Sequence, residues 1–235
     1  MIYVMSDLHG CYEEFLKALE VISFKDEDEL YIIGDIMDRG KHPILLLQDL
    51  MMRPNVFPLM GNHDYMALTV LKKLCVEITD ENVETHLKEE DLMNYYQWVK
   101  EGGHSTLREF QSLSYEEKMD IIEYLEEFSL CEEIRVQDKT YVLVHAGIER
   151  FKEEKSIYDF DFVDLIFVPC DYTRQYYQNK YLVTGHTPTF KIDESCRGKI
   201  YQKYNHIGLD CGCIYGLNLG VYCLNTQKCF YIEKQ

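Results

Sequence analysis

The sequence is poor in basic residues, has a single tryptophan and contains no long apolar run. Its 235 residues include 24 lysines and arginines against 41 aspartates and glutamates, a formal net charge of −17. A surface this acidic repels nucleic-acid backbones and anionic membranes, which argues against a protein that coats duplexes or binds such membranes. No apolar stretch approaches the roughly 18 residues that a membrane-spanning helix needs.

The N-terminal residues, MIYVMSDLHG, also lack the basic segment of a secretory signal peptide. We therefore expect a cytoplasmic protein whose nine cysteines are reduced thiols. Four cysteines crowd the C-terminal part, but their spacing differs from the paired Cys-x-x-Cys of common structural zinc sites. Packing inside strands is therefore favoured over a zinc site for these residues, which are Cys211, Cys213, Cys223 and Cys229.

The first 62 residues show strand and helix patterns in alternation. Apolar runs at 2–5, 30–33 and 56–60 predict strands, and segments 11–20 and 43–52 predict the helices between them. This order indicates a largely parallel sheet, whose functional sites lie at the carboxyl ends of the strands.

Residues 64 to about 130 are acidic, helix-prone and nearly free of proline, which predicts a helical insert within a single domain spanning 1–235. Ser114 and Glu117 have the spacing of a helix capping box. The pair Gly102-Gly103 interrupts the helical pattern. The single tryptophan, Trp98, is expected to anchor the packing of the insert, because large aromatic side chains mostly serve packing.

Strand signals return after residue 131, at 141–144 and 181–184, and residues 206–232 predict a closing β-meander. Five polar clusters follow candidate strands, each with Asp, His or Asn directly after an apolar run. One sheet edge would gather these side chains, which are ligand types for Mn²⁺, Fe or Zn²⁺. The clusters are Asp7-Leu8-His9-Gly10, GDIMDRG at 34–40, GNHD at 61–64, HAG at 145–147 and GHT at 185–187.

In this order the clusters resemble the motifs of the metal-dependent phosphoprotein phosphatases of the calcineurin-like metallophosphoesterase superfamily, in their bacterial form. Ser6 replaces the first glycine of the family pattern. The similarity runs from residue 1 to about 188 and, more loosely, to 210–212. It implies an α/β fold, a four-layer sandwich of two mixed β-sheets flanked by helices, with the helical insert at about 64–130.

The resemblance also implies two divalent metal ions, with Mn²⁺ expected and Fe, Zn²⁺ or Mg²⁺ as alternatives. Two such cations lower the pKa of a shared water, and the bridging hydroxide attacks phosphorus without a phosphoenzyme. By position in the motifs, the implied ligands are Asp7 and His9 for the first ion, Asn62, His145 and His186 for the second, and Asp35 as the bridge.

Three further residues of these motifs have catalytic roles by resemblance. His63 would be the general acid that protonates the leaving oxygen, and Asp38 would hold its other ring nitrogen. Arg39 would bind the phosphate through its fork of donors, with Asn62 also facing the phosphate.

The sequence departs from the family pattern at one position. Family members usually carry a second phosphate-binding arginine ahead of the Gly-His-Thr strand, where this chain has Pro169. Arg174, five residues later, is the candidate substitute. We assign no site role to His42, His86, His104 and His206, and Cys11 lacks the surroundings of a phosphatase nucleophile.

Together these motifs predict a phosphomonoesterase acting on a phosphorylated protein or a small phosphoester, most plausibly a serine/threonine protein phosphatase. A symmetrical dinucleoside tetraphosphatase shares the same clusters and is the alternative. A phosphodiesterase or nuclease is less favoured because such members generally lack the Asp38-Arg39 pair. A catalytically weak scaffold protein is the non-enzymatic alternative. Substrate choice depends on the site walls, residues 64–130 and 148–180.

Overall fold

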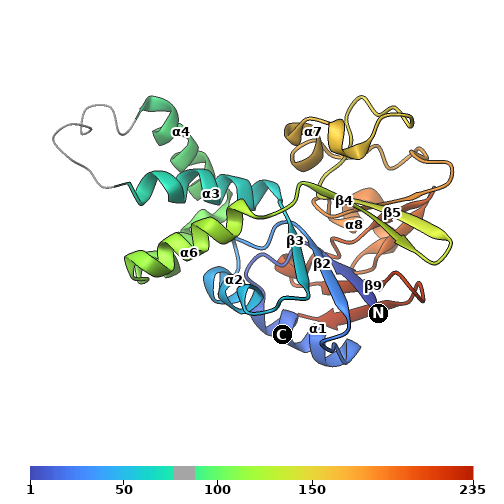
Figure 1. The fold of residues 1–235 in the computed structure, drawn as a ribbon, viewed down its shortest axis with the longest axis horizontal. Coiled ribbons are helices and arrows are strands. Elements are labelled where there is room, and N and C mark those ends of the chain that lie inside the picture. The colour runs from blue at the N-terminus through green and yellow to red at the C-terminus, as the bar shows by residue number, and fades with distance from the viewer. Residues whose placement is uncertain (77–87, 235) are drawn as a thin grey trace.

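The computed structural model describes residues 1–76 and 88–234, which form two five-stranded sheets (Figure 1). The first sheet has the strand order β10-β9-β1-β2-β3. Strands β1, β2 and β3 are parallel, and the β9–β10 hairpin adds antiparallel to β1. The bounds are β1 Ile2–Met5, β2 Glu29–Ile33, β3 Val56–Leu59, β9 Asn218–Cys223 and β10 Cys229–Glu233.

The second sheet has the order β4-β5-β6-β8-β7. Strands β5, β6 and β8 are parallel, while β4 and β7 pair antiparallel at the two edges. Both sheets are therefore mixed, with the parallel strands at the centre of the second sheet and from the centre to one edge of the first. The bounds are β4 Cys131–Val136, β5 Lys139–Val144, β6 Tyr181–Thr184, β7 Tyr201–Lys203 and β8 His206–Gly208.

Helices flank the two sheets. Helix α1 packs on β9 and β10, and α2 contacts α1, α5 and α6. Among residues 1–76 and 88–234, no helix has the length and apolar character to cross a membrane. The bounds outside the insert are α1 Tyr12–Ile22, α2 Pro43–Met51, η2 Ile157–Asp159, α7 Phe162–Ile166, α8 Thr189–Ile192, η3 Glu194–Cys196 and η4 Cys213–Tyr215.

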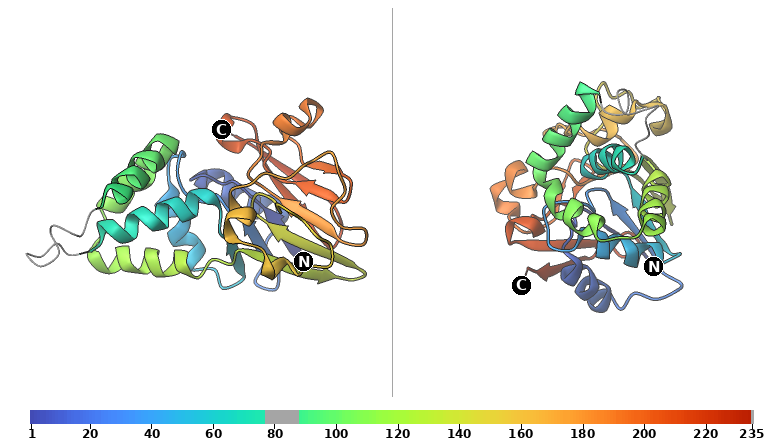
Figure 2. Two further views of the ribbon diagram at one scale, coloured as in Figure 1. Left: turned by 90° about the horizontal axis from the view of Figure 1, so that it is seen from above. Right: turned by 90° about the vertical axis from the view of Figure 1, so that its left-hand side faces the viewer.

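Between β3 and β4 the described chain is helical, and Figure 2 shows these helices projecting to one side of the sheets. The capping box forms at α6, where the Ser114 hydroxyl accepts the Glu117 N–H at 3.3 Å and the Glu117 carboxylate accepts the Ser114 N–H at 2.8 Å. The helices are α3 Asn62–Leu74, α4 Glu89–Trp98, the π-helical η1 Val99–Gly103, α5 His104–Gln111 and α6 Tyr115–Glu126.

A continuous apolar core joins the inner faces of the two sheets. Val4 and Ile33 of the first sheet pack with Tyr141, Leu143 and Val183 of the second, all buried. Packing of two mixed sheets face to face, with helices outside, confirms the predicted four-layer α/β sandwich.

The prediction of a closing meander over 206–232 is wrong in one respect. Strand β8 lies in the second sheet, parallel to β6, whereas β9 and β10 lie in the first sheet. The chain therefore crosses between the sheets after β8. Local patterning cannot reveal this crossing, because strands of both sheets bury the same kinds of apolar side chains.

Candidate active site

The segments that follow the parallel strands of both sheets meet at one edge of the sandwich. The Asp7 N–H donates to the Gly34 carbonyl at 3.0 Å, which ties the end of β1 to the end of β2. The Gly185 N–H donates to the His145 carbonyl at 2.9 Å, which ties β6 to β5 in the other sheet. Five strand-end clusters, distant in sequence, thus form one polar site.

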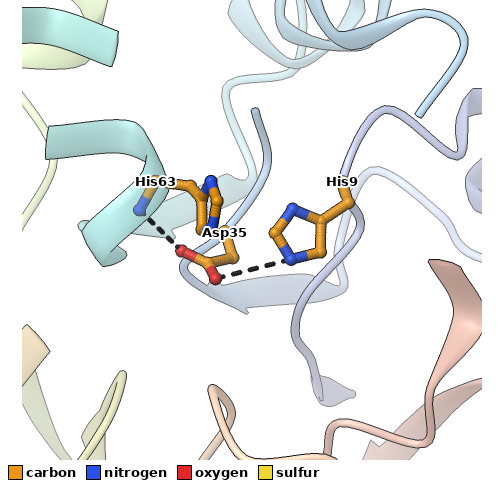
Figure 3. A group of neighbouring side chains, drawn as sticks. All are labelled: His9, Asp35 and His63. Carbon is orange, nitrogen blue, oxygen red and sulfur yellow. Dashed lines mark hydrogen bonds and ion pairs between the residues drawn. The ribbon is translucent and has the colours of Figure 1, made fainter. Parts of the chain in front are cut away.

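Asp35, after β2, lies at the centre of this site. Its Oδ2 is 3.5 Å from His9 Nε2, and its Oδ1 accepts the backbone N–H of His63 at 3.0 Å (Figure 3). On the other side, Oδ1 is 3.3 Å from His145 Nε2. Two groups of possible ligand atoms share this carboxylate, each group within 4.8 Å: one adds His9 and His63, the other His145 and His186.

Asn62 and Asp7 adjoin the second group. The Asn62 Oδ1 lies 3.1 Å from His145 Nε2 and 2.9 Å from His186 Nδ1. The Asp7 carboxylate accepts the backbone N–H of His186, with both oxygens at 3.0 Å. The structure therefore brings together all six side chains that the motifs single out as metal ligands.

Hydrogen bonds to backbone carbonyls orient two of the imidazole rings. The Nδ1 of His9 lies 2.9 Å from the Met37 carbonyl, and the Nδ1 of His145 lies 2.9 Å from the Ile33 carbonyl. A carbonyl only accepts, so each Nδ1 carries a proton and each ring turns its Nε2 toward Asp35. Backbone carbonyls orient metal-binding histidines in this way.

As a result, hydrogen-bond acceptors face one another around Asp35. Imidazole lone pairs, the carboxylate and the Asn62 carbonyl repel each other unless a cation lies between them. Burial lowers the pKa of His145, but the neighbouring Asp35 carboxylate outweighs it and raises that pKa to about 10. This set of oxygen and imidazole donors fits divalent metal ions such as Mn²⁺, Fe²⁺ or Zn²⁺.

A second unit, built on Asp38, adjoins the ligand groups. The Asp38 Oδ2 accepts the Nδ1–H of His63 at 2.9 Å. The Trp98 Nε1–H donates to both Asp38 oxygens at 3.0 and 2.9 Å, and the Thr106 hydroxyl donates to Oδ1 at 2.7 Å. Burial disfavours the charged His63 ring, but Asp35 and Asp38 raise its pKa above the usual value.

The role of Trp98 is thus larger than the sequence suggested. Its ring is fully buried, in keeping with a packing anchor, and its N–H also holds the carboxylate that orients His63. The insert therefore supplies two of the hydrogen-bond donors to Asp38. No local pattern around Trp98 pointed to this contact, because Asp38 lies sixty residues earlier in the chain.

Arg39 spans the ligand groups and the Asp38 unit. Its NH1 donates to His9 Nε2 at 3.0 Å and its NH2 to His63 Nε2 at 2.7 Å. Its Nε donates to the Glu101 carbonyl at 3.3 Å, which ties the guanidinium to the insert. A donor-only guanidinium in this position points its fork into the site, as a phosphate contact requires.

The glycine pair of the insert has a packing role beyond interrupting a helix. Gly102 has φ of 114°, and its carbonyl accepts the Arg39 N–H at 3.1 Å. A Cβ on Gly103 would come within 2.3 Å of the Trp98 ring. Gly102 needs to be glycine because the insert approaches Arg39 closely there, and Gly103 because the Trp98 ring packs against it.

Several site residues adopt left-handed backbone conformations, which are uncommon for residues other than glycine and cluster at functional sites. These turns aim successive side chains of one loop into the site. They are found at Asp7 (φ 53°), His9 (42°), Asp35 (55°), Asp38 (72°), Arg39 (63°) and His186 (62°).

Asp64 is a site-supporting residue that sequence reasoning missed. Its buried carboxylate accepts the backbone N–H groups of Ile36, Met37 and Gly61, each at 3.0 Å. Burial raises its pKa to about 6. The residue stands in the Gly-Asn-His-Asp motif, and its helix-start position was the available signal, since a carboxylate there caps free N–H groups.

Arg174 lies apart from this arrangement. Its exposed guanidinium stacks on the rings of Tyr176 (4.4 Å) and Phe151 (5.7 Å). Pro169 lies against Gly147, whose added Cβ would come within 2.9 Å of the proline carbonyl carbon. A phosphate-binding role for Arg174 stays a prediction, and it requires the guanidinium to leave these rings.

The other histidines that the structure describes do not belong to the candidate ligand groups. His206 is buried and bonds to the Thr184 hydroxyl at 2.9 Å, while His42 pairs with Glu109 at 2.9 Å. His104 is exposed, and His86 lies outside the described residues. Of the three that the structure describes, none belongs to the two groups around Asp35.

The described cysteines are all free thiols. Cys213 lies in a buried group with Cys11 and Glu14. Within the described residues it is not grouped with the other three C-terminal cysteines, as a four-cysteine zinc site would require. The Lys234 ammonium lies 3.2 Å from Cys11 Sγ and donates to the Glu14 carboxylate at 2.9 Å, so a protein cation already occupies this group.

The fold and this site define a class of protein. Residues 1–206 match the calcineurin-like phosphoesterase family, and the chain belongs to that family. Proteins of this family are phosphoester hydrolases that use a dinuclear divalent metal centre.

Curated relatives share a more specific name. The chain is 32% identical over 100 residues to a symmetrical bis(5'-nucleosyl)-tetraphosphatase of Haemophilus ducreyi, covering 42% of this chain and 37% of that protein. It is 28% identical over 101 residues to the protein of the same name from Shewanella putrefaciens CN-32, with the same coverage. The matches thus span little more than a third of the length of these relatives.

Solved structures show the same fold over the whole chain. A structure described as a candidate diadenosine tetraphosphatase superposes with a TM-score of 0.68 at 18% identity, covering 100% of this chain and 93% of that one. A serine/threonine phosphatase from Saccharomyces cerevisiae gives a TM-score of 0.56 at 14% identity, covering 100% and 80%. These similarities concern the fold alone.

Proposed function

We propose that this chain is a symmetrical dinucleoside tetraphosphatase, which cleaves the central bridge of its substrate to give two nucleoside diphosphates. The two ligand groups that share Asp35 carry the phosphoesterase chemistry of this proposal. The names of the curated relatives support the substrate class. A serine/threonine protein phosphatase, our first expectation from the motifs, has only a fold similarity in its favour.

In this proposal, Asp7 and His9 would hold one divalent ion, Asn62, His145 and His186 would hold the other, and Asp35 would be shared by the two sites. Mn²⁺ is the expected metal, with Fe, Zn²⁺ or Mg²⁺ as alternatives. When bound, the pair supplies an activated water and neutralises charge on the phosphoryl oxygens.

The side chains beside the metal ligands perform the remaining steps. Phosphate oxygens are better acceptors for Arg39 than the imidazole nitrogens that it contacts in this structure, so substrate draws its fork away from His63. Nε2 of His63 is then free to carry the proton that goes to the leaving oxygen. Asn62 turns its Oδ1 toward His145 and His186, which leaves its amide N–H groups for the phosphate.

Product analysis with two substrates tests the proposal. Purified protein is incubated with diadenosine tetraphosphate or a phosphothreonine peptide, each with Mn²⁺ and with chelator. We expect metal-dependent formation of ADP as the sole nucleotide product, resolved by chromatography. Formation of AMP with ATP would contradict symmetrical cleavage. Turnover of the peptide alone would assign the chain to the protein phosphatases.

A change at Trp98 tests the support of Asp38 by the insert. Trp98→Phe keeps a buried aromatic ring but removes the N–H that donates to both Asp38 oxygens. Loss of such a supporting contact typically costs about 10- to 100-fold in activity. We expect kcat to fall by about tenfold or more with metal content unchanged. Equal kcat for the variant and the wild type would show that Asp38 needs no help from Trp98.

A change at Arg174 tests the predicted second phosphate contact. If Arg174 binds phosphate, Arg174→Ala raises KM for diadenosine tetraphosphate by about tenfold, because a charge-assisted bond is worth about 1.5–3 kcal/mol. Arg150→Ala, an exposed arginine paired with Glu149, is the control. Wild-type kinetics for Arg174→Ala would exclude it from the phosphate site.

A further inference from the structure

A cleft beside the phosphate-binding residues is not used by the mechanism above. It has a volume of about 330 Å³ and lies between α3, α4 and the residue that follows α7. Small-molecule sites in proteins occupy about 300–1,000 Å³, so a flat ring with its attached groups fits. Its lining includes Tyr65, Met66, Glu90, Asn94, Gln97 and Phe167.

The α3 wall of the cleft adjoins the proposed general acid. Tyr65 and Met66 follow His63 by two and three positions on helix α3. Residues three apart lie on one face of a helix, so Met66 and His63 share a face. The apolar lining of the cleft therefore begins within one helical turn of His63.

The other two walls are also tied to site residues. The Gln97 side-chain amide donates to the Glu101 carboxylate at 2.9 Å. The backbone carbonyl of the same Glu101 accepts the Arg39 Nε–H. Phe167 lies two residues after Leu165 in the chain. The Leu165 carbonyl accepts the N–H of Ala146 at 2.8 Å, and Ala146 is the residue after the predicted ligand His145. Each wall of the cleft is thus linked to a site residue through a short run of chain or a hydrogen bond.

The chemistry of the lining favours a nucleobase. The Phe167 and Tyr65 rings lie edge to face with centroids 6.0 Å apart, and Met66 adds a polarisable thioether. Carboxamides of Asn94 and Gln97 both donate and accept, and the Glu90 carboxylate accepts, as an amino-substituted heterocycle requires. The same carboxylate repels phosphate, so the polyphosphate chain must lie toward Arg39.

We propose that this cleft binds one nucleobase of the dinucleoside tetraphosphate, with adenine-type amino heterocycles as its ligand class. This inference rests on the proposed function. Symmetrical cleavage places two phosphates and a ribose between the scissile bond and each base. A base site must therefore lie beside the phosphate site and not within it, as this cleft does.

Competitive inhibition by ADP and by inorganic pyrophosphate separates the contribution of the base from that of the phosphates. ADP and inorganic pyrophosphate carry the same diphosphate, but only ADP has a nucleoside. In the wild type we expect the inhibition constant of ADP to be the lower. Because stacking of a base on an aromatic side chain contributes about 1–3 kcal/mol, Phe167→Ala should raise the ADP constant and KM for the dinucleotide about 5- to 150-fold. The pyrophosphate constant should not change.

Two further variants make the test decisive. Phe167→Leu keeps an apolar side chain of similar size, which preserves folding while removing the ring. Tyr95→Ala, on the same α4 helix but lining a different cavity, is the matched control and should behave as wild type.

Equal effects of the Phe167 variants on ADP and pyrophosphate, or none on ADP, would overturn the inference. Lowered turnover of a phosphopeptide with an unchanged ADP constant would also overturn it and would assign the cleft to peptides. If diadenosine tetraphosphate is not cleaved, the proposed function fails. The two inhibitors are then compared on whichever phosphoester is turned over, so the cleft is still tested.

Discussion

His63→Asn is expected to lower kcat for diadenosine tetraphosphate by about 10²-fold while both metal ions stay bound. General-acid catalysis typically contributes about 10²–10⁴-fold. The lower end is expected here because the leaving group is a nucleoside diphosphate, whose oxygen needs less help from a proton than an alkoxide does. Turnover is measured by ADP formation, and metal content by elemental analysis of the same preparation.

The matched control for this change is His42→Asn, since His42 is a partly exposed histidine that pairs with Glu109. It should retain wild-type turnover. A loss smaller than about tenfold in His63→Asn would contradict the role of His63 as general acid. Loss of metal from that variant would instead make His63 a ligand, as its membership of the His9–Asp35 group permits.

Asp35→Asn is expected to remove both metal ions at once. Its two oxygens face His9 on one side and His145 on the other, and among residues 1–76 and 88–234 Asp35 is the member that the two ligand groups share. Loss of the metals should remove several kcal/mol of transition-state stabilisation, or roughly 10³-fold or more in kcat. Metal content after dialysis and ADP formation are the two measurements.

Asp26→Asn, in an exposed acidic turn, is the control for the removal of one carboxylate and should bind metal as the wild type does. Thermal unfolding checks that Asp35→Asn remains folded. Loss of one metal with full retention of the other would place Asp35 in a single ion site. Wild-type metal content would exclude Asp35 as a ligand altogether.

A protein phosphatase and a dinucleoside tetraphosphatase can share the same metal-site residues but need different surroundings for the substrate. A protein phosphatase needs an open surface for a polypeptide, whereas a dinucleotide needs places for its bases beside the phosphates. The cleft between α3, α4 and Phe167 supplies such a place. This agrees with the names of the curated relatives, whose matched segments cover 37% of their length.

Much of the candidate site could be predicted from the sequence because its polar residues follow the ends of strands. Asp7, Asp35 and His145 each come directly after an apolar run, and parallel strands bring their carboxyl ends to one edge. The fold class followed from the same alternation together with the family motifs. Short-range patterning was sufficient wherever a residue's role depends on its place at the end of its own strand.

Roles that depend on contacts across the chain were decided only by the tertiary structure. Trp98 and Thr106 hold Asp38 from the insert, and the Gly102-Gly103 pair allows that approach. The placement of β8 and β9 in different sheets is of the same kind. The position of a residue at the end of its own strand is specified locally by hydrophobic periodicity. The contacts of Trp98 and Thr106 with Asp38 depend instead on packing between distant segments, and neither segment's sequence indicates the other.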